Sequence, residues 1–135
     1  MDIVLDSNVL FRTLISQGNI LEIIFNPKLQ ILAPKKLIEE FNNNKKEILF
    51  KSKLSESEFD ILLKLLLENI SFIELDEYKE FIPNAKQLLK EHLKDVEFVA
   101  LALKLNCKVW TYELLLFEIG FGISTKELIE LIASS

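Results

Sequence analysis

The feature that most constrains this chain is an apolar helical segment at residues 94–105, KDVEFVALALKL, followed by a short strand pattern at residues 108–111. Its apolar side chains recur with the i, i+3, i+4, i+7 spacing of a helix, at Val96, Val99, Ala100 and Leu103. A helix that is hydrophobic nearly all round is buried inside a domain. The segment therefore predicts a central helix that leads into a buried strand.

Two acidic residues bracket this helix–strand unit. Asp95 opens the helix, and Glu113 follows the strand. In an open α/β sheet, a helix that leads into a strand starts at the edge where the strands end, so we expect both acids at one edge of a sheet. Ligands bind at that edge, and carboxylates gathered there without basic partners indicate a metal ion.

The rest of the chain alternates strand and helix patterns, which predicts an α/β fold with a parallel sheet. Besides residues 108–111, we expect strands at residues 2–5, 29–32, 70–75 and 120–123. We expect further helices at residues 9–14, 20–25, 34–49, 55–70, 84–91, 114–119 and 124–132, and a polar connection at 76–81. Capping-box patterns at Ser55 and Ser124 mark two helix starts. A length of 135 residues without a linker predicts one domain, residues 1–135.

The composition limits the chemistry that this chain can perform. Cys107 is the single cysteine and His92 the single histidine, which excludes an internal disulfide and a Cys/His zinc cluster and disfavours catalysis by a serine–histidine or cysteine–histidine pair. We expect Cys107 in the core and His92 on the surface. The net charge of −5 argues against a large basic face for nucleic acid, but not against a nuclease whose carboxylates hold cations.

The sequence also bears on location and assembly. No apolar run approaches the roughly 20 residues that span a bilayer, and the N-terminus lacks the profile of a signal peptide, so we expect a cytoplasmic protein without membrane contact. Apolar residues at 61–67 cover more than one face of the expected helix. Either that helix is enclosed within the domain or its outer side meets another subunit, with a homodimer as the simplest outcome.

A third acid, Asp6, ends the first expected strand and is followed by the turn residues Ser7 and Asn8. Taken alone, Asp6 has the simple interpretation of a helix N-cap. However, Asp6, Asp95 and Glu113 all fall at the same expected edge, and two carboxylates about 4 Å apart repel by roughly 4 kcal/mol at an effective dielectric of 20. Oxygen ligands alone suit Mg²⁺ or Mn²⁺, whose natural chemistry here is the attack of water on a phosphodiester.

Four segments together resemble the PIN-domain nucleases, notably the toxin halves of prokaryotic toxin–antitoxin pairs: LDSNVL, LIEEF, KDVEFVALALKLN, and VWT followed by an acid. The resemblance spans nearly the whole chain. It implies a three-layer α/β/α fold with a short central parallel sheet flanked by helices, and an endoribonuclease that uses Mg²⁺ or Mn²⁺, with RNA as substrate and an antitoxin protein as partner. It also implies that Asp6, Glu40 and Asp95 are catalytic metal ligands and that other residues shape the site, namely Ser7, Asn8 and Thr111.

The chain departs from the family pattern at the fourth acidic position. The family usually shows a small polar residue, then Asp, then a second Asp two positions on, where this chain has Tyr112, Glu113 and Leu115. We therefore expect Glu113 to be the weak member of the site. The alternative function is a catalytically weakened PIN scaffold that binds protein or RNA. Glu97 points about 200° around the helix from Asp95, so it is not counted as a ligand.

Overall fold

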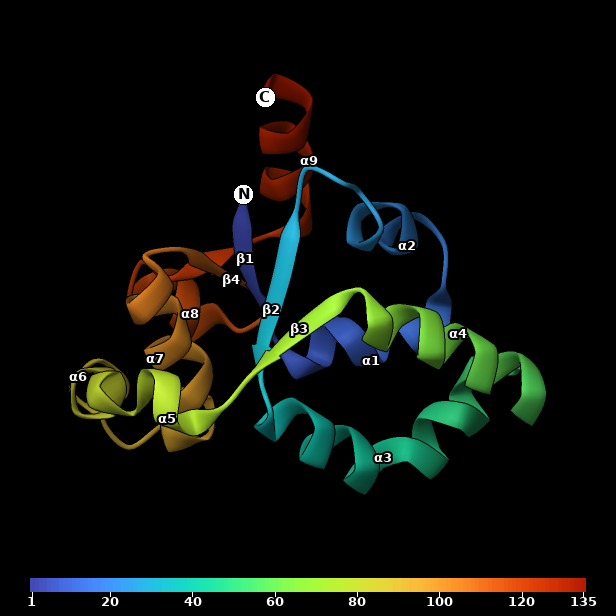
Figure 1. The fold of residues 1–135 in the computed structure, drawn as a ribbon, viewed down its shortest axis with the longest axis horizontal. Coiled ribbons are helices and arrows are strands. Elements are labelled where there is room, and N and C mark those ends of the chain that lie inside the picture. The colour runs from blue at the N-terminus through green and yellow to red at the C-terminus, as the bar shows by residue number, and fades with distance from the viewer.

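A five-stranded sheet runs through the computed structural model, which describes residues 1–135 (Figure 1). The strands lie in the order β3-β2-β1-β4-β5, and every neighbouring pair is parallel. Their bounds are β1 (Asp2–Leu5), β2 (Gln30–Pro34), β3 (Ile70–Ile73), β4 (Lys108–Trp110) and β5 (Gly122–Ile123). The central strands read as short apolar runs because helices cover a parallel sheet on both faces.

Helices form a layer on each face of this sheet. One layer contains α1 (Ser7–Ser16), α3 (Lys36–Ser52) and α4 (Glu56–Glu68), and the other contains α5 (Leu75–Tyr78), α6 (Ile82–Leu89) and α7 (Val96–Leu105) (Figure 1). The remaining elements are α2 (Asn19–Ile24), η1 (Lys79–Phe81), η2 (Leu93–Asp95), α8 (Leu114–Glu118) and α9 (Thr125–Ser134). The expected three-layer α/β/α fold with a central parallel sheet is therefore confirmed.

The helix α7 is the central helix that the sequence predicts. It contacts β1, β2 and β4, and it buries nearly every side chain of its first two turns. Burial of each large aliphatic or aromatic side chain contributes about 1.5–3 kcal/mol. The helix ends at Asn106, whose left-handed conformation (φ 54°) lets the chain turn directly into β4.

Two segments differ from the sequence prediction. Pro34 was expected to start a helix, but it is the last residue of β2, where it pairs with Ile73, and α3 begins only at Lys36. The fixed φ of proline suits a strand end as well as a first helical turn. Residues 76–81 were expected to be a polar connection, but they form helical turns in which Tyr78 is buried and its hydroxyl donates to Glu97 Oε1 at 2.9 Å.

Several smaller expectations are met. Both capping boxes form, at Ser55 before α4 and at Ser124 before α9. Cys107 is half-buried and packs against the core, and His92 is exposed. No helix is both long and apolar enough to cross a membrane.

The helix α4 has two apolar sides with different surroundings. Phe59 and Leu66 are buried against the body of the protein. Ile61 and Leu65 are 64% and 49% exposed, and they lie four residues apart on one side of the helix. The helix is thus not enclosed within the domain, so the first of the two interpretations of its apolar residues is wrong.

Candidate functional site

The candidate site lies where β1 and β4 end side by side. Leu5 pairs with Trp110 in register, and the backbone N–H of Asp6 donates to the Trp110 carbonyl at 3.0 Å. In the sheet, β2 is the neighbour of β1 on one side and β4 is its neighbour on the other. The connection that follows β1 leads to β2, and the connection that follows β4 leads to β5, so the two connections run in opposite directions from this point. Open α/β sheets bind their ligands in the crevice at such a switch point. Asp6 and Thr111 are the first residues beyond the two strands.

Asp6 is held in place by the neighbouring strand rather than by the helix that it precedes. It occupies the N-cap position of α1 with extended backbone, but its side chain makes no capping hydrogen bond. Instead, Thr111 Oγ1 donates to Asp6 Oδ2 at 2.6 Å. Both side chains are buried, and Asp6 is only 4% exposed. The interpretation of Asp6 as a capping side chain is therefore wrong, and its carboxylate is fixed across the sheet.

The Asp6 carboxyl has an unusual proton affinity. Burial, together with the smaller effect of the negative charges of Asp95 and Glu113, raises its pKa to about 6, although the Thr111 hydrogen bond acts in the opposite direction. The ionised form is thus disfavoured by both desolvation and like charge. A buried carboxylate of this kind at a ligand-binding edge is a candidate functional group.

Asp95 is the second buried acid. It ends η2 immediately before α7, is 6% exposed, and makes no side-chain cap. Burial raises its pKa, the positive charges of Lys94 and Lys36 lower it, and the negative charges of Glu113 and Glu40 raise it. Asp95 therefore lies within electrostatic reach of the acids contributed by α3 and by the segment after β4.

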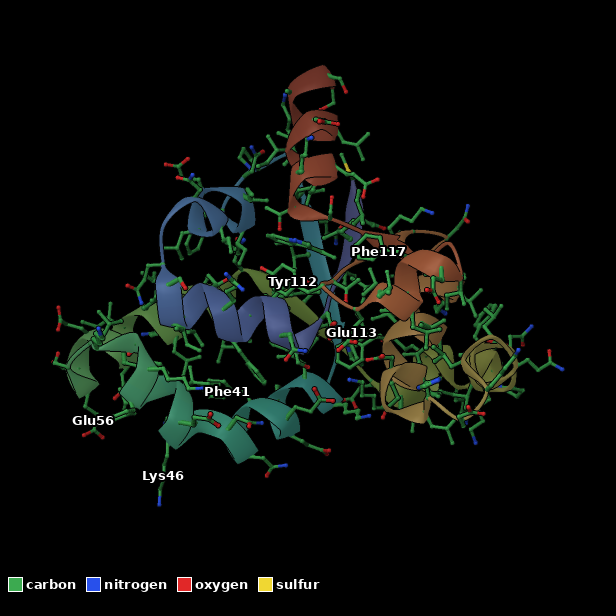
Figure 2. All side chains as sticks on the ribbon, turned by 180° about the vertical axis from the view of Figure 1, so that it is seen from behind. Phe41, Lys46, Glu56, Tyr112, Glu113 and Phe117 are labelled. Atoms are coloured by element: carbon green, nitrogen blue, oxygen red, sulfur yellow. The ribbon has the colours of Figure 1, made fainter.

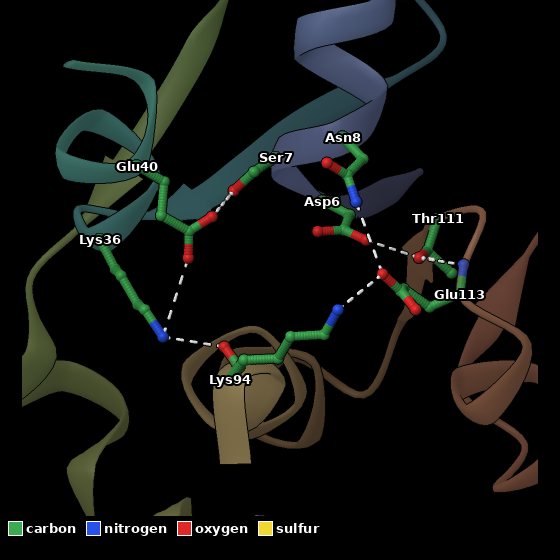
Figure 3. A network of polar contacts seen from close by, with 8 residues as sticks. All are labelled: Asp6, Ser7, Asn8, Lys36, Glu40, Lys94, Thr111 and Glu113. Carbon is green, nitrogen blue, oxygen red and sulfur yellow. Dashed lines mark hydrogen bonds and ion pairs between the residues drawn. The ribbon is translucent and has the colours of Figure 1, made fainter. Parts of the chain in front are cut away.

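Glu40 reaches the site from α3. Ser7 Oγ, at the start of α1, donates a hydrogen bond to Glu40 Oε2 (Figure 3). Lys36, one turn earlier on α3, places Nζ 3.7 Å from Glu40 Oε1. The resemblance implied that this glutamate belongs to the site, whereas its position within a helix alone would predict a solvated charge.

Glu113 closes the opposite side of the site. Its Oε1 accepts from Lys94 Nζ at 3.0 Å and from Asn8 Nδ2 at 3.5 Å, and its backbone N–H donates to Thr111 Oγ1 at 3.0 Å (Figure 3). Lys36 Nζ donates to the Lys94 carbonyl at 2.8 Å. The two lysines thus connect the Glu40 side of the site with the Glu113 side.

The structure brings every expected site residue to this one edge: Asp6, Ser7, Asn8, Glu40, Asp95, Thr111 and Glu113. As the side chains lie, no three acids converge closely enough to form a ready-made ion site. The expectation that these carboxylates lack basic partners is wrong, because Lys36 lies beside Glu40 and Lys94 beside Glu113. The available signals were the position of Lys36 four residues before Glu40 and that of Lys94 directly before Asp95.

The donor set fits a hard divalent cation in its chemistry. All the candidate ligands are carboxylate oxygens, which suit Mg²⁺ or Mn²⁺. Two of them, from Asp6 and Asp95, are buried with raised pKa values, so their charged forms need compensation. A cation would supply that compensation and would compete with Lys36 and Lys94 for the two glutamates.

A comparison with family models finds a match over most of the chain. A family described as "PIN domain" matches residues 4–133, a range that contains all four candidate acids. No curated protein matches the chain significantly.

Proposed function

Because this chain belongs to the PIN-domain family, whose members are generally nucleases, we propose that it is a metal-dependent endoribonuclease. The observation that carries the proposal is Asp6, a buried carboxylate at the switch point of the sheet whose pKa is raised by burial and by neighbouring acids. Keeping such a group ionised costs folding free energy. Bound Mg²⁺ or Mn²⁺ would offset that cost and would activate water against an RNA phosphodiester.

The residues of the site have distinct proposed roles. Asp6, Glu40 and Asp95 would hold the ion, with Glu113 as a weaker fourth ligand. Thr111 positions Asp6 through its hydroxyl and restrains the Glu113 backbone through the same oxygen. Ser7 positions Glu40 in the same way. Hydrogen bonds to metal-binding carboxylates orient them, and their loss typically costs ten- to a hundredfold in metal affinity or activity, roughly.

The test of this function is cleavage of RNA by the purified protein. We expect cleavage with Mg²⁺ or Mn²⁺, none in excess EDTA, and none by Asp6→Asn or Asp95→Asn. Glu97→Gln is a matched control, because Glu97 is an acid of α7 that contacts Tyr78 instead of the site. Cleavage that survives in EDTA, or in both aspartate variants, would contradict the proposal.

We further propose that the protein is the toxin component of a toxin–antitoxin system and acts with an antitoxin protein. The four segments LDSNVL, LIEEF, KDVEFVALALKLN and VWT support this assignment by their resemblance. A small upstream reading frame that encodes a DNA-binding motif would agree with it. Expression of the wild type should arrest growth, whereas Asp95→Asn should not. Arrest by both proteins would count against a nuclease toxin.

The second candidate function is a PIN scaffold with weakened catalysis that binds protein or RNA. It is favoured by the ion pair between Lys94 and Glu113, which occupies the fourth acid, and by Leu115 in place of a further acid. A scaffold would bind its partner equally well with or without divalent cations and would leave RNA uncut. The cleavage assay above separates the two functions.

We also propose a homodimer through α4, because Ile61 and Leu65 expose apolar surface on one side of that helix. Leu65→Lys should yield a monomer by light scattering. Asp60→Lys is the control and should leave the dimer intact, because Asp60 is exposed on α4 but points at least about 100° around the helix from Ile61 and Leu65. A wild-type monomer at high concentration would contradict this assembly.

A further inference from the structure

A groove of about 430 Å³ lies next to the acids, between α1 and α3. Ile15 and Ile48 give it an apolar base, and Tyr112 forms its end at the segment after β4. None of the proposed metal ligands lines it. The proposed metal chemistry therefore leaves this neighbouring groove without a role.

Tyr112 and Arg12 form an exposed pair in this groove. The Arg12 guanidinium carbon lies 5.7 Å from the centroid of the Tyr112 ring, within the range of a cation–π contact. The Tyr112 side chain is 43% exposed, so its ring remains accessible. Arg12 is absent from the five ion pairs of the protein, whereas Lys51 in the same groove is paired with Glu47 at 2.7 Å. Arg12 is thus the unneutralised positive charge of the groove.

The groove is continuous with the acidic edge. Tyr112 directly precedes Glu113, and Figure 2 labels both where the segment after β4 lies beside α1. Asn8 lines the groove and also donates to Glu113 Oε1 at 3.5 Å. A polymer whose phosphate lies at the acids would therefore continue past Asn8 and Tyr112 into the groove.

We propose that this groove binds an unpaired nucleotide next to the cleaved bond of a single-stranded RNA, with its base stacked on Tyr112 and a phosphate held by Arg12. The proposal rests on the proposed nuclease function and adds to it a nucleotide subsite formed by Tyr112 and Arg12, neither of which belongs to the proposed metal site. Bases stack on aromatic rings and guanidinium planes, and a guanidinium binds phosphate through paired donors. A base within a duplex is covered on both faces, so only an unpaired one reaches the ring.

The groove also offers groups that suit the edge of a base. Asn44 lines it from α3, and its Nδ2 donates to the Glu40 carbonyl at 2.7 Å, which leaves its Oδ1 as an acceptor. Asn8, which is exposed at the start of α1, adds an amide at the side of the groove nearest the acids. These amides favour a nucleotide over a purely apolar protein segment as the occupant.

Binding is best tested in Asp95→Asn protein in EDTA, which prevents cleavage and removes one repelling charge. Fluorescence anisotropy with a labelled single-stranded RNA should give tighter binding than with the same sequence in a duplex. Adding Tyr112→Ala should raise the Kd about tenfold, because stacking on one aromatic ring is worth about 1–3 kcal/mol per base. Arg12→Ala should also raise it, whereas Tyr112→Trp should retain affinity.

Phe25→Ala is the matched control, because Phe25 is 42% exposed, much like Tyr112, and lies after α2 outside the groove. It should bind RNA like its parent. The proposal is overturned if the Kd of the Tyr112→Ala protein for single-stranded RNA stays within twofold of the Kd of its parent. Loss of binding to a protein, with unchanged binding to RNA, would also overturn it.

A second measurement separates this inference from the nuclease function. In otherwise wild-type protein with Mn²⁺, Tyr112→Ala should raise KM more than it lowers kcat. If Tyr112→Ala cleaves RNA with an unchanged KM, the nuclease function is supported and the nucleotide subsite is contradicted. If RNA binding depends on Tyr112 but the wild-type protein never cleaves, the subsite is supported and the nuclease function is contradicted.

Discussion

The inner and outer halves of the acidic site are built in different ways. The inner half consists of Asp6, Thr111 and Asp95, which are at most 6% exposed and are positioned by strand ends and a helix start. The outer half consists of Glu40 and Glu113, which are half-buried and lie near Lys36 and Lys94. Both inner acids are thus desolvated; Asp6 has a neutral hydrogen-bond partner and Asp95 forms no ion pair, whereas the two outer acids are paired with lysines.

Because of this difference, the two halves should contribute to cation binding in different ways. A short aspartate fixed by backbone geometry keeps its position whether or not an ion is present, and its uncompensated charge favours cation binding. A longer glutamate paired with an exposed lysine is inexpensive to keep ionised, but it must change partners to bind an ion. We therefore expect the inner half to determine whether the ion binds, and the outer half to adjust how tightly.

The strongest test of this comparison replaces one acid from each half. Asp95→Ala should lower RNA cleavage by more than about a hundredfold, because it removes a metal ligand outright, and should abolish Mn²⁺ binding in calorimetric titration. Glu113→Ala should lower both by about tenfold or less, since a lysine already competes for its carboxylate. Equal losses of metal affinity in the two variants would show that Glu113 is a full ligand and that the halves do not differ.

The second test concerns the folding cost of the inner half. The folded pKa of Asp6 is raised from 3.8 to about 6, so between these values the folded state holds a proton that the unfolded state has lost. Stability without metal should therefore fall as pH rises from about 4 to about 6 and stay lower above that. Asp6→Asn removes this loss and should raise the free energy of unfolding at pH 7 by about 3 kcal/mol, because each unit of the shift in the Asp6 pKa corresponds to about 1.4 kcal/mol.

The control for this effect is pH 4, where wild type and Asp6→Asn should have nearly the same free energy of unfolding. Added Mn²⁺ at pH 7 should raise the Tm of the wild type and leave that of Asp6→Asn nearly unchanged, because ligand binding stabilises only a protein that binds. An Asp6→Asn variant that is less stable than wild type at pH 7 would show that the carboxylate contributes to folding.

Much of this arrangement follows from local patterns in the sequence. Strand ends and helix starts place Asp6, Asp95 and Glu113, because the strands of a parallel sheet all end at one edge. The pairings that distinguish the two halves join distant residues, such as Ser7 with Glu40, and depend on how α1 packs on α3. The burial of Tyr78 within the helical turns at residues 76–81 likewise involves a distant residue, because its hydroxyl donates to Glu97.

The third test removes a positioning group of the inner half without changing its charge. Thr111→Val keeps the shape of the buried side chain but loses the hydroxyl that donates to Asp6 and accepts from the Glu113 backbone. We expect cleavage to fall by roughly tenfold, because outer-sphere hydrogen bonds orient the ligands. Thr111→Ser should retain most activity as the control. If valine and serine behave alike, then the hydroxyl does not position Asp6.

The smallest expected effect comes from the lysine of the outer half. Lys94 Nζ lies 3.0 Å from Glu113 Oε1, and its side chain is 68% exposed. Exposed ion pairs contribute about 0.2–1 kcal/mol, so Lys94→Gln should release Glu113 and tighten Mn²⁺ binding by at most about fivefold. The gain should shrink as salt is added, because salt already screens the exposed pair.

Lys104→Gln, an exposed lysine in the last turn of α7, controls for the change in net charge and should leave Mn²⁺ affinity unaltered. Calorimetric titration of both variants decides between two roles for Lys94. Tighter binding means that the lysine competes with the ion, as the comparison of the two halves requires. Weaker binding means that Lys94 holds Glu113 in the position from which it binds the ion, and the outer half would then be as preorganised as the inner one.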